Sequence, residues 1–505
     1  MQNCTEKRAY LSVFYKEGIE IAAKKLIELG YKIISTGATF EYLKTKGIEA
    51  VESSTITGFK ELLSGKVKSL HPEIFAGILA DKNEIKTLGF PPISVVIVNL
   101  YPFELYVGKN TDIETLVKNI DIGGAALLRA GAKNYENVVV ITDKEDYTLD
   151  FDNLGPDERK ELALKVFKKT SNYDNLIFEE LSKNFGFNEE NDCDFLNFSF
   201  VKKQNLRYGE NPHQKASLYD FGQKKPDYEV LGGKELSYNN ISDITSALNI
   251  VSEFFDVNAA VIVKHTNPCG AALGVTLEDA WDKALDCDPL SAFGGIVAFS
   301  KKVNIEIARK LTSMFLEVIV APDYDDNALQ LLKTKKNLRI IKLNTPLEDW
   351  KNYLGKEIKL TPFGALIQES DKKELNPETF KTVTKEKPTP EMIEDMVFAH
   401  KIAKHLKSNA IVVAKDLKTI GICGGQTSRV GAVEIALRRV ADSAKDAILA
   451  SDGFFPATDN ITAAALYGIK GIIQPGGSIK DKEVIETADK LNICMITTGI
   501  RHFKH

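Results

Sequence analysis

The sequence predicts an α/β protein whose first part forms a parallel sheet covered by helices on both faces and whose second half is also α/β. Two observations support this fold class. Apolar runs rich in Val and Ile recur along the chain, and amphipathic helical stretches separate them. Continuous apolar strands that alternate with helices are typical of parallel sheets buried on both faces. The apolar runs lie at 31–35, 48–51, 93–98, 138–142, 259–265, 294–300, 318–322, 409–414 and 470–477.

The composition limits the class of protein further. The 505 residues carry 65 Lys and Arg against 70 Asp and Glu, a net charge of -5, which excludes a general attraction to nucleic acid. At about 150 residues per domain, this length predicts about three domains. No apolar run approaches the ~18 residues of a membrane helix and the first residues lack a secretory signal, so we expect a cytoplasmic protein without membrane contact. The six cysteines form no C-x-x-C pair, so we expect reduced thiols.

The first helix is predicted at 18–30, directly before the strand at 31–35. Apolar residues recur there at spacings of three and four, and Gly30 is placed to end the helix. The face turned toward the sheet would consist of Ile19, Ala22, Ala23, Leu26 and Ile27. Further helical patterns at 112–120 and 125–133 lie between two of the predicted strands.

Two boundaries divide the chain into three predicted domains. A charged helical stretch at 157–170 leads into the acidic, irregular segment 188–194, where apolar periodicity stops. A second join is expected near 360, in a stretch rich in Lys, Asp and Pro. The predicted domains are therefore 1–195, 196–360 and 361–505.

Three segments of the first domain place polar residues at strand or helix ends, where open α/β sheets bind ligands. Ser35–Thr39 either holds a phosphate with its hydroxyls and helix N–H groups or serves as a cap and turn. Asn99–Phe103 is either a ligand-contacting loop or a turn with an aromatic plug. Asp121 is either an N-cap or half of an acid/base pair with Lys133. A helix spanning these last two residues would separate their backbones by about 18 Å.

Two further clusters bring basic residues together. Lys66 and Lys68 stand two residues apart beside Ser69 and His71, a spacing that also arises by chance. The sharpest site is 264–270, where Lys264 and His265 end a predicted strand and supply a cation and a base that titrates near neutrality. Zinc deaminases carry H-x-E and P-C-x-x-C at such a place. This segment lacks both the acid and the second cysteine, so the sequence excludes a zinc site of that kind.

Taken in order, many segments resemble one family, in which AICAR formyltransferase is joined to IMP cyclohydrolase in a bifunctional purine biosynthesis protein. They span nearly the whole chain. The segments are LSVFYKEG, STGAT, KVKSLHP, NLYPF, IDIGGAALLRAGAKN, LRYGENPHQ, LSYNNISD, VIVKHTNPCG, DPLSAFGGIVAF, EVIVAP, KSNAIVVAK, GGQTSRVG, SDGFFP, IQPGGSIKD and RHFKH.

The resemblance implies a fold, an activity and an assembly. The first domain would be a methylglyoxal-synthase-like cyclohydrolase, followed by a formyltransferase made of two cytidine-deaminase-like units without a catalytic metal. The enzyme would transfer a formyl group from 10-formyltetrahydrofolate to AICAR and close the ring of formyl-AICAR to give IMP. A homodimer is implied, with formyltransferase sites formed across its interface.

The resemblance also assigns residues to the cyclohydrolase site. Lys133 would be the proton donor and acceptor, with Lys68, Tyr101, Asp121 and Ile122 around the base. Phosphate and nucleotide contacts would come from Ser12, Lys16, Ser35, Thr36, Gly37, Thr39, Lys66, Ser69, Asn99 and Leu100.

In the formyltransferase, the resemblance makes His265 the proton acceptor and Lys264 the group that stabilises the transition state. AICAR would be held by Arg207, Tyr208, Gly294, Glu317, Asn409 and Arg429. The folate side would be formed by Val430, Asp459, Ser478, Ile479 and Arg501.

The chain departs from the family's pattern at three places. Phe14 and Tyr15 replace a Ser-Asp pair, so a hydroxyl for phosphate is lost and backbone N–H groups remain. Lys66 stands where arginine is common, which replaces a bidentate fork with a point charge. Thr458 replaces a basic residue beside Asp459. Two rival classes can be tested by experiment: a deaminase-like zinc hydrolase, which would carry stoichiometric zinc, and a nucleotide or folate sensor, which would bind AICAR without turnover.

Overall fold

The computed structural model describes residues 6–59, 67, 69–87, 89–109, 111–187, 196, 198–220 and 225–505. The chain divides into two compact units, 1–199 and 200–505. The acidic segment 188–194, where the sequence predicts a boundary, lies outside the described residues. No helix among the residues described combines the length and the apolar character needed to cross a bilayer.

The first unit is built on a five-stranded sheet in which all neighbouring strands are parallel, in the order β3-β2-β1-β4-β5. β2 and β3 lie on one side of β1, and the later strands β4 and β5 lie on its other side. The carboxyl ends of β1 and β4 therefore flank the point where the strand order reverses, which is where such sheets bind ligands. The strands are β1 Lys7–Val13, β2 Tyr31–Ser35, β3 Val51–Glu52, β4 Ile93–Asn99 and β5 Val139–Ile141.

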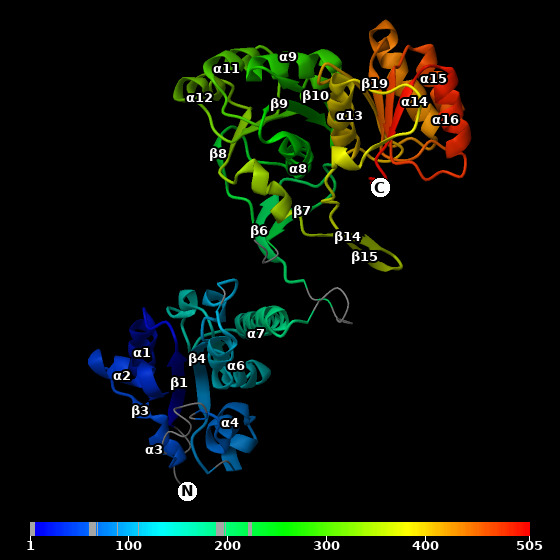
Figure 1. Cartoon of the computed structure of the whole chain (residues 1–505). Helices are drawn as coiled ribbons and strands as arrows, with labels where there is room; N and C mark the ends of the chain where they lie inside the picture. The colour runs from blue at the N-terminus through cyan, green and yellow to red at the C-terminus, as the bar shows by residue number, and fades with distance from the viewer. Residues whose placement is uncertain are drawn as a thin grey trace. The chain divides into compact units, whose positions relative to one another are not determined.

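Helices cover both faces of this sheet, with α1 and α2 on one side and α6 and α7 on the other (Figure 1). One core cluster contains Leu11 and Leu26, and the other contains Tyr10 and Leu128, since neighbouring residues of β1 point to opposite faces. The helices are α1 Ile19–Glu28, α2 Gly37–Thr45, α3 Ser53–Thr57, α4 Pro72–Leu79, α5 Ile113–Lys118, α6 Gly123–Lys133 and α7 Pro156–Asn184.

Most elements predicted for this unit are confirmed, with two corrections. The helix expected at 18–30 is present, and Gly30 follows it with a φ of 82°. Ile27 was expected on the buried face but is 40% exposed, because the buried stripe passes through Leu26 and the next residue is turned about 100° away. The strand expected at 48–51 is also wrong in extent, since β3 begins only at Val51.

The second unit contains a 12-stranded mixed sheet, in the order β16-β21-β20-β19-β17-β18-β10-β9-β11-β12-β13-β8. Its strands are β8 Tyr228–Gly232, β9 Asn258–Lys264, β10 Asn267–Gly274, β11 Ile296–Phe299, β12 Val318–Ala321, β13 Arg339–Leu343, β16 Lys381–Thr382, β17 Ile411–Lys415, β18 Lys418–Cys423, β19 Ile448–Ser451, β20 Gly471–Gln474 and β21 Cys494–Thr497.

The large sheet consists of two halves with the same internal order. In each half a hairpin, β9-β10 or β17-β18, is followed by three mutually parallel strands, β11 to β13 or β19 to β21. β10 and β18 pair antiparallel where the halves meet, so the two halves run in opposite directions. The amino ends of β11 to β13 therefore lie at the same edge of the sheet as the carboxyl ends of β19 to β21. We call this edge the shared edge.

Helices form two layers around the large sheet (Figure 1). α8 and α13 contribute to a single core that spans both halves on one face. On the other face, α9, α11 and α12 cover the first half and α14, α15 and α16 cover the second. The helices are α8 Tyr238–Val251, α9 Leu277–Cys287, α10 Pro289–Ala292, α11 Ile305–Thr312, α12 Asp326–Lys333, α13 Pro390–Ala403, α14 Arg429–Val440, α15 Asp459–Leu466 and α16 Asp481–Lys490.

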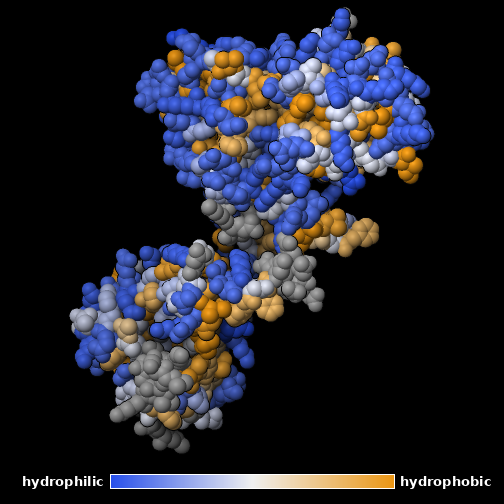
Figure 2. Space-filling view, in the orientation of Figure 1, coloured by the Kyte–Doolittle hydropathy of each residue, from blue (hydrophilic) through white to orange (hydrophobic). Residues whose placement is uncertain are grey.

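Two hairpins of this unit lie outside the large sheet: β6 (Val201–Leu206) with β7 (Ala216–Asp220), and β14 (Lys356–Thr361) with β15 (Gly364–Glu369). Leu360, Phe363 and Leu366 of the β14-β15 hairpin are exposed, and Figure 2 shows hydrophobic colour over it. The second boundary predicted from the sequence, near 360, falls within β14.

Candidate functional site

Asn99 ties together two loops at the carboxyl edge of the first sheet. It is the last residue of β4, and its Oδ1 accepts hydrogen bonds from the backbone N–H groups of Phe14 and Tyr15, the latter at 3.1 Å. Its Nδ2 donates to the hydroxyl of Tyr147 at 3.2 Å. The backbone N–H groups that the sequence leaves for phosphate at this loop are therefore bound to a side chain of the protein.

The hydroxyls at 35–39 mostly bond to the backbone of β1. Ser35 Oγ donates to the carbonyl of Leu11 at 2.7 Å, and Thr39 Oγ1 donates to the carbonyl of Val13 at 3.0 Å. Thr36 precedes α2 but makes no side-chain capping bond, and Gly37 begins the helix with a φ of 47°. The hydroxyls of Ser35 and Thr39 thus fix the loop against β1.

Lys16 and Ser12 lie at the same end of β1. The Lys16 ammonium donates to the carbonyl oxygens of Val13 and Phe14, the latter at 3.0 Å. Ser12 is half-buried on β1 opposite Val98 of β4. The residues predicted from LSVFYKEG, STGAT and NLYPF are therefore brought to one edge of the sheet.

Asp121 joins the next part of this edge. Its Oδ2 accepts from the backbone N–H of Tyr101 at 3.2 Å, and its Oδ1 accepts from the N–H of Gly124 at 2.7 Å. The carboxylate therefore caps the first turn of α6, which is one of the two roles the sequence leaves open. The rings of Phe14 and Tyr101 meet edge to face, with centroids 5.6 Å apart.

Lys133 does not join this cluster within one chain. It is the last residue of α6, and it is exposed at the opposite end of the helix from Asp121. Ser69 does join the cluster, since it is buried and a Cβ placed on Gly123 would lie 2.5 Å from its Oγ. Leu100 is buried and Ile122 is exposed. Lys66 and Lys68 lie outside the described residues.

Lys264 and His265 lie at the shared edge of the second unit. Lys264 ends β9, and its Nζ donates to the carbonyl of Phe293 at 2.8 Å. His265 and Thr266 form the two-residue turn into β10, with φ values of 55° and 61°. His265 is exposed there. Cys269 points back into β9, where burial raises the pKa of its thiol to about 12, so it is a neutral thiol near pH 7.

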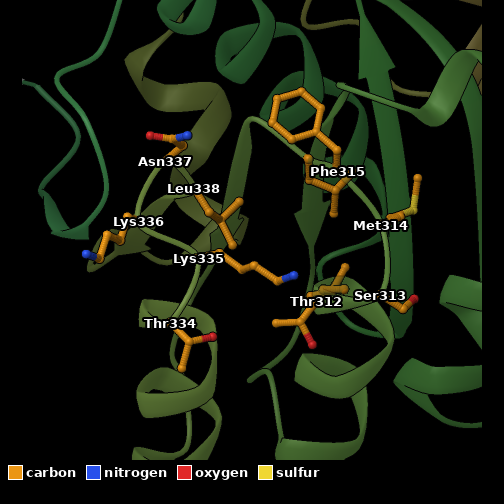
Figure 3. Close-up of a pocket in the computed structure, with 11 residues that line it drawn as sticks. Thr312, Ser313, Met314, Phe315, Thr334, Lys335, Lys336, Asn337 and Leu338 are labelled. Atoms are coloured by element: carbon orange, nitrogen blue, oxygen red, sulfur yellow. The ribbon is translucent and has the colours of Figure 1, made fainter.

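Gly294 and Glu317 lie beside this turn. Gly294 has a φ of 73°, and its N–H donates to the carbonyl of Phe315 at 2.8 Å. The Glu317 carboxylate accepts from Asn240 Nδ2 at 2.8 Å, which places it against the start of α8. A hollow of about 440 Å³ adjoins them, lined by Phe315, Lys335 and their neighbours (Figure 3).

A buried ion pair supports the other half of the shared edge. The Arg429 guanidinium donates to Asp452 Oδ1 and, at 3.2 Å, to the carbonyl of Ala410. The same carboxylate accepts from the N–H of Ala410 at 3.0 Å and from Ser408 Oγ. Asn409 Nδ2 donates to the carbonyl of Gln426 at 2.9 Å. Asp452 thereby fixes Asn409 and Arg429 relative to each other.

The remaining predicted residues of this unit follow the same edge. Arg207 NH2 donates to Tyr208 Oη at 2.6 Å, in the loop after β6, and Asn239 of α8 donates to the carbonyl of Glu210 at 3.3 Å in that loop. The predicted folate-side residues follow the carboxyl ends of β18 to β21. They are Val430, Asp459, Ser478, Ile479 and Arg501.

Sequence reasoning missed four residues that organise this site: Ser408, Asp452, Asn240 and Asp243. Asp452 is fully buried, although the sequence Ser-Asp-Gly is typical of an exposed turn. The one local feature that could have indicated its burial is the apolar run 448–451 directly before it. Asn240 and Asp243 stand within the quoted segment LSYNNISD, but no spacing rule connects them with 265 or 317.

Comparison with known proteins gives a consistent result. A family model described as AICARFT/IMPCHase bienzyme matches residues 131–439, and one described as MGS-like domain matches 18–126. The chain is 48% identical to the bifunctional purine biosynthesis protein PurH of Caldicellulosiruptor saccharolyticus, with 99% of this chain and 100% of the relative covered. The proteins of the same name from Persephonella marina and Aquifex aeolicus are 45% and 46% identical at the same coverage.

Proposed function

This chain belongs to the AICARFT/IMPCHase bienzyme family, and we propose on this premise that it catalyses the last two steps of IMP synthesis. The first step transfers a formyl group from 10-formyltetrahydrofolate to the 5-amino group of AICAR. The second closes the ring of formyl-AICAR with loss of water. The observation that carries the proposal is the convergence of Lys264, His265, Asn409 and Arg429 on one edge of the large sheet, in a chain that matches its relatives from end to end.

The two steps are assigned to different parts of the chain. Residues 1–195 would form the cyclohydrolase, and the two halves of the large sheet, 196–360 and 361–505, would form the formyltransferase. The MGS-like match and the ligand-binding edge of the parallel sheet support the first assignment. We further propose a cytoplasmic homodimer that acts on small molecules without a catalytic metal.

The chemistry of formyl transfer explains why a base and a cation are needed. The amine of AICAR is conjugated with its ring and carboxamide, so it is a weak nucleophile until it loses a proton. His265 accepts that proton as the nitrogen attacks the formyl carbon. The Lys264 ammonium faces the oxyanion that develops on the formyl oxygen. Such groups each contribute about 100-fold or more to a rate.

The folate co-substrate supplies the formyl group. The residues assigned to it follow the carboxyl ends of β18, β19, β20 and β21, and Ile479 is fully exposed there, so an apolar ring system has a surface to cover. Asp459 accepts from the N–H of Asn460 at 2.8 Å at the start of α15, and its carboxylate is a hydrogen-bond acceptor suited to the amino group of a pteridine.

Ring closure requires the carboxamide nitrogen of formyl-AICAR to attack the formyl carbon while water leaves. Asp121, Tyr101 and Asn99 are placed around one loop cluster, whereas Lys133 stands at the far end of α6. We therefore propose that Lys133 of a second copy completes each site. Mixing Asp121→Ala with Lys133→Ala subunits would then restore cyclisation in about one site in four. Two inactive variants that stay inactive after mixing would contradict this arrangement.

The direct test uses the purified chain with AICAR and 10-formyltetrahydrofolate, followed by chromatography of the products. Formation of IMP and tetrahydrofolate is the expected result. Accumulation of formyl-AICAR would contradict the cyclohydrolase half and would point to the Phe14-Tyr15 replacement. Binding of AICAR without turnover would favour the sensor, and stoichiometric zinc in elemental analysis would favour the hydrolase.

A further inference from the structure

The turn that carries His265 has a second copy in the other half of the large sheet. His265 and Thr266 connect β9 to β10 with φ values of 55° and 61°, and Asp416 and Leu417 connect β17 to β18 with φ values of 55° at both positions. Two-residue turns of this kind favour Asn-Gly, because L side chains rarely adopt positive φ. Neither turn contains glycine, so another contact must hold each of them in this conformation.

A carboxylate on the preceding helix provides that contact in both halves. Asp395 of α13 accepts the backbone N–H groups of Asp416 and Leu417, at 3.0 and 2.6 Å. Asp243 of α8 accepts the N–H of Thr266 at 2.6 Å. α8 begins at Tyr238 and α13 at Pro390, so each aspartate stands in the second turn of its helix. The contact between a helix aspartate and the hairpin turn is therefore repeated in the two halves of the large sheet.

The lysines of the two copies also correspond. Lys264 donates to the backbone carbonyl of Phe293 at 2.8 Å, and Lys415 donates to that of Lys445 at 3.0 Å. The two halves differ in the first turn residue, which is His265 in one and Asp416 in the other. The second half is thus a natural control, because it has the lysine, the turn and the carboxylate but no histidine.

The carbonyl of the second turn residue is bound in both halves, but by different groups: in the second half the Leu417 carbonyl accepts from the backbone N–H of Leu273 at 2.9 Å. Ser246 of α8 donates from Oγ to the carbonyl of Thr266 at 2.8 Å, so both the N–H and the C=O of Thr266 are bound to α8. Burial raises the pKa of Asp243, and the backbone N–H groups of Thr266 and His265 counter that effect. The Asp243 carboxylate and the turn therefore stabilise each other, since the N–H groups of the turn favour the charged carboxylate and the carboxylate binds the backbone of the turn.

We propose that Asp243 is a positioning residue for formyl transfer, which holds the His265–Thr266 turn in its left-handed conformation and so fixes the imidazole relative to Lys264. This inference rests on the proposed function. A base acts only within hydrogen-bond reach of the proton it removes, and a displacement of about 1 Å lowers rates by about 100-fold. Release of the turn moves His265 directly, because the ring is attached to a residue whose φ the carboxylate constrains.

The test compares Asp243→Ala with Asp395→Ala, each in the full-length protein. Both variants remove one carboxylate from a turn of the same geometry, and thermal unfolding and gel filtration check that both remain folded. Asp243→Ala is expected to lower kcat for formyl transfer by about 100-fold with little change in the KM for AICAR. Asp395→Ala is expected to keep kcat within about twofold. Equal losses in kcat would overturn the proposal, since they would reflect general destabilisation.

Two further measurements separate positioning from loss of structure. If Asp243 acts through His265, the double variant with His265→Ala is no slower than His265→Ala alone, whereas independent effects would multiply. Asp243→Asn keeps an oxygen acceptor for Thr266 N–H and is expected to regain at least tenfold in kcat over Asp243→Ala. If Asp243→Ala does not fold, Asp243→Asn is compared with Asp395→Asn instead. The loss in kcat is then expected to be larger for Asp243→Asn.

The wild-type protein serves as the reference that distinguishes two failures. If the wild type makes no formyl-AICAR, the proposed function fails. If the wild type and both alanine variants turn over at the same rate, the positioning role fails while the proposed function stands.

Discussion

A buried cluster of charged groups at the carboxyl ends of α8 and α13 contributes to the stability of the second unit. Glu253 is 7% exposed and accepts hydrogen bonds from Lys351 Nζ at 3.0 Å, Lys404 Nζ at 3.5 Å and His405 Nε2 at 3.2 Å. Its neighbours hold the pKa of Glu253 well below its usual range in spite of burial. Burial lowers the pKa of His405, so its neutral ring donates a hydrogen bond at pH 7. Glu253 is therefore the charge that balances Lys404.

Glu253→Gln keeps the size of the side chain and removes this charge. Breaking a buried ion pair from one side costs about 3–5 kcal/mol, because the other charge stays buried. Lys351 keeps Glu374 at 3.0 Å, so the lower end of that range applies, about 3 kcal/mol. At about 2 °C per kcal/mol the melting temperature of the second unit should fall by about 6 °C.

The matched control is Glu374→Gln, which removes the other partner of Lys351. Its side chain is 75% exposed, and exposed ion pairs contribute about 0–1 kcal/mol. Calorimetry of both variants and the wild type gives the comparison. Equal shifts in melting temperature for the two variants would refute the argument from burial.

The pH dependence of the same variants has a defined sign. The pKa of Glu253 is lower in the folded state than its ordinary value of 4.5, so its stabilisation is complete above pH 4.5 and is lost as the pH falls below it. The difference between wild type and Glu253→Gln should therefore be full at pH 7 and shrink in acid. A difference that grows as the pH falls would contradict this assignment.

Two further predictions concern the sites themselves. Lys133→Ala should make formyl-AICAR accumulate from AICAR, and chromatography showing IMP at the wild-type rate would remove Lys133 from the mechanism. Asp452→Ala should lower the free energy of unfolding by about 3–5 kcal/mol, because it leaves the Arg429 guanidinium buried without its counter-charge. Urea unfolding of the variant and the wild type measures this difference. A loss below about 1 kcal/mol would show that the guanidinium finds another partner or water.

The sequence predicts strands that are long apolar runs, such as β4 and β9, but it gives no prediction for the short strands β19 and β21 or for strands rich in small residues. β10 reads NPCGAALG, and its small residues hide it from an apolar pattern. They are needed because α9 lies so close that a Cβ on Gly270 would be 1.9 Å from the carbonyl oxygen of Ala284. β18 has the same restriction at Gly421 against Ala436.

The shared edge could not be predicted for a related reason. It depends on the pairing of β10 with β18, whose residues are far apart in the chain and which have no local signal for their direction. The sequence placed Lys264, His265 and Asn409 at strand ends correctly but could not show that these ends face the same way. The contact between Asn99 and the Phe14 loop was equally out of reach, since it joins side chain to backbone across the sheet.

The most direct test of the claim that the two reactions use separate sites is to assay one variant with two substrates. His265→Ala is given AICAR with 10-formyltetrahydrofolate in one assay and formyl-AICAR in the other. Two separate sites predict that formyl transfer is lost while formyl-AICAR is still converted to IMP at the wild-type rate. Loss of both activities in a folded variant would contradict the division of the two reactions between the two units.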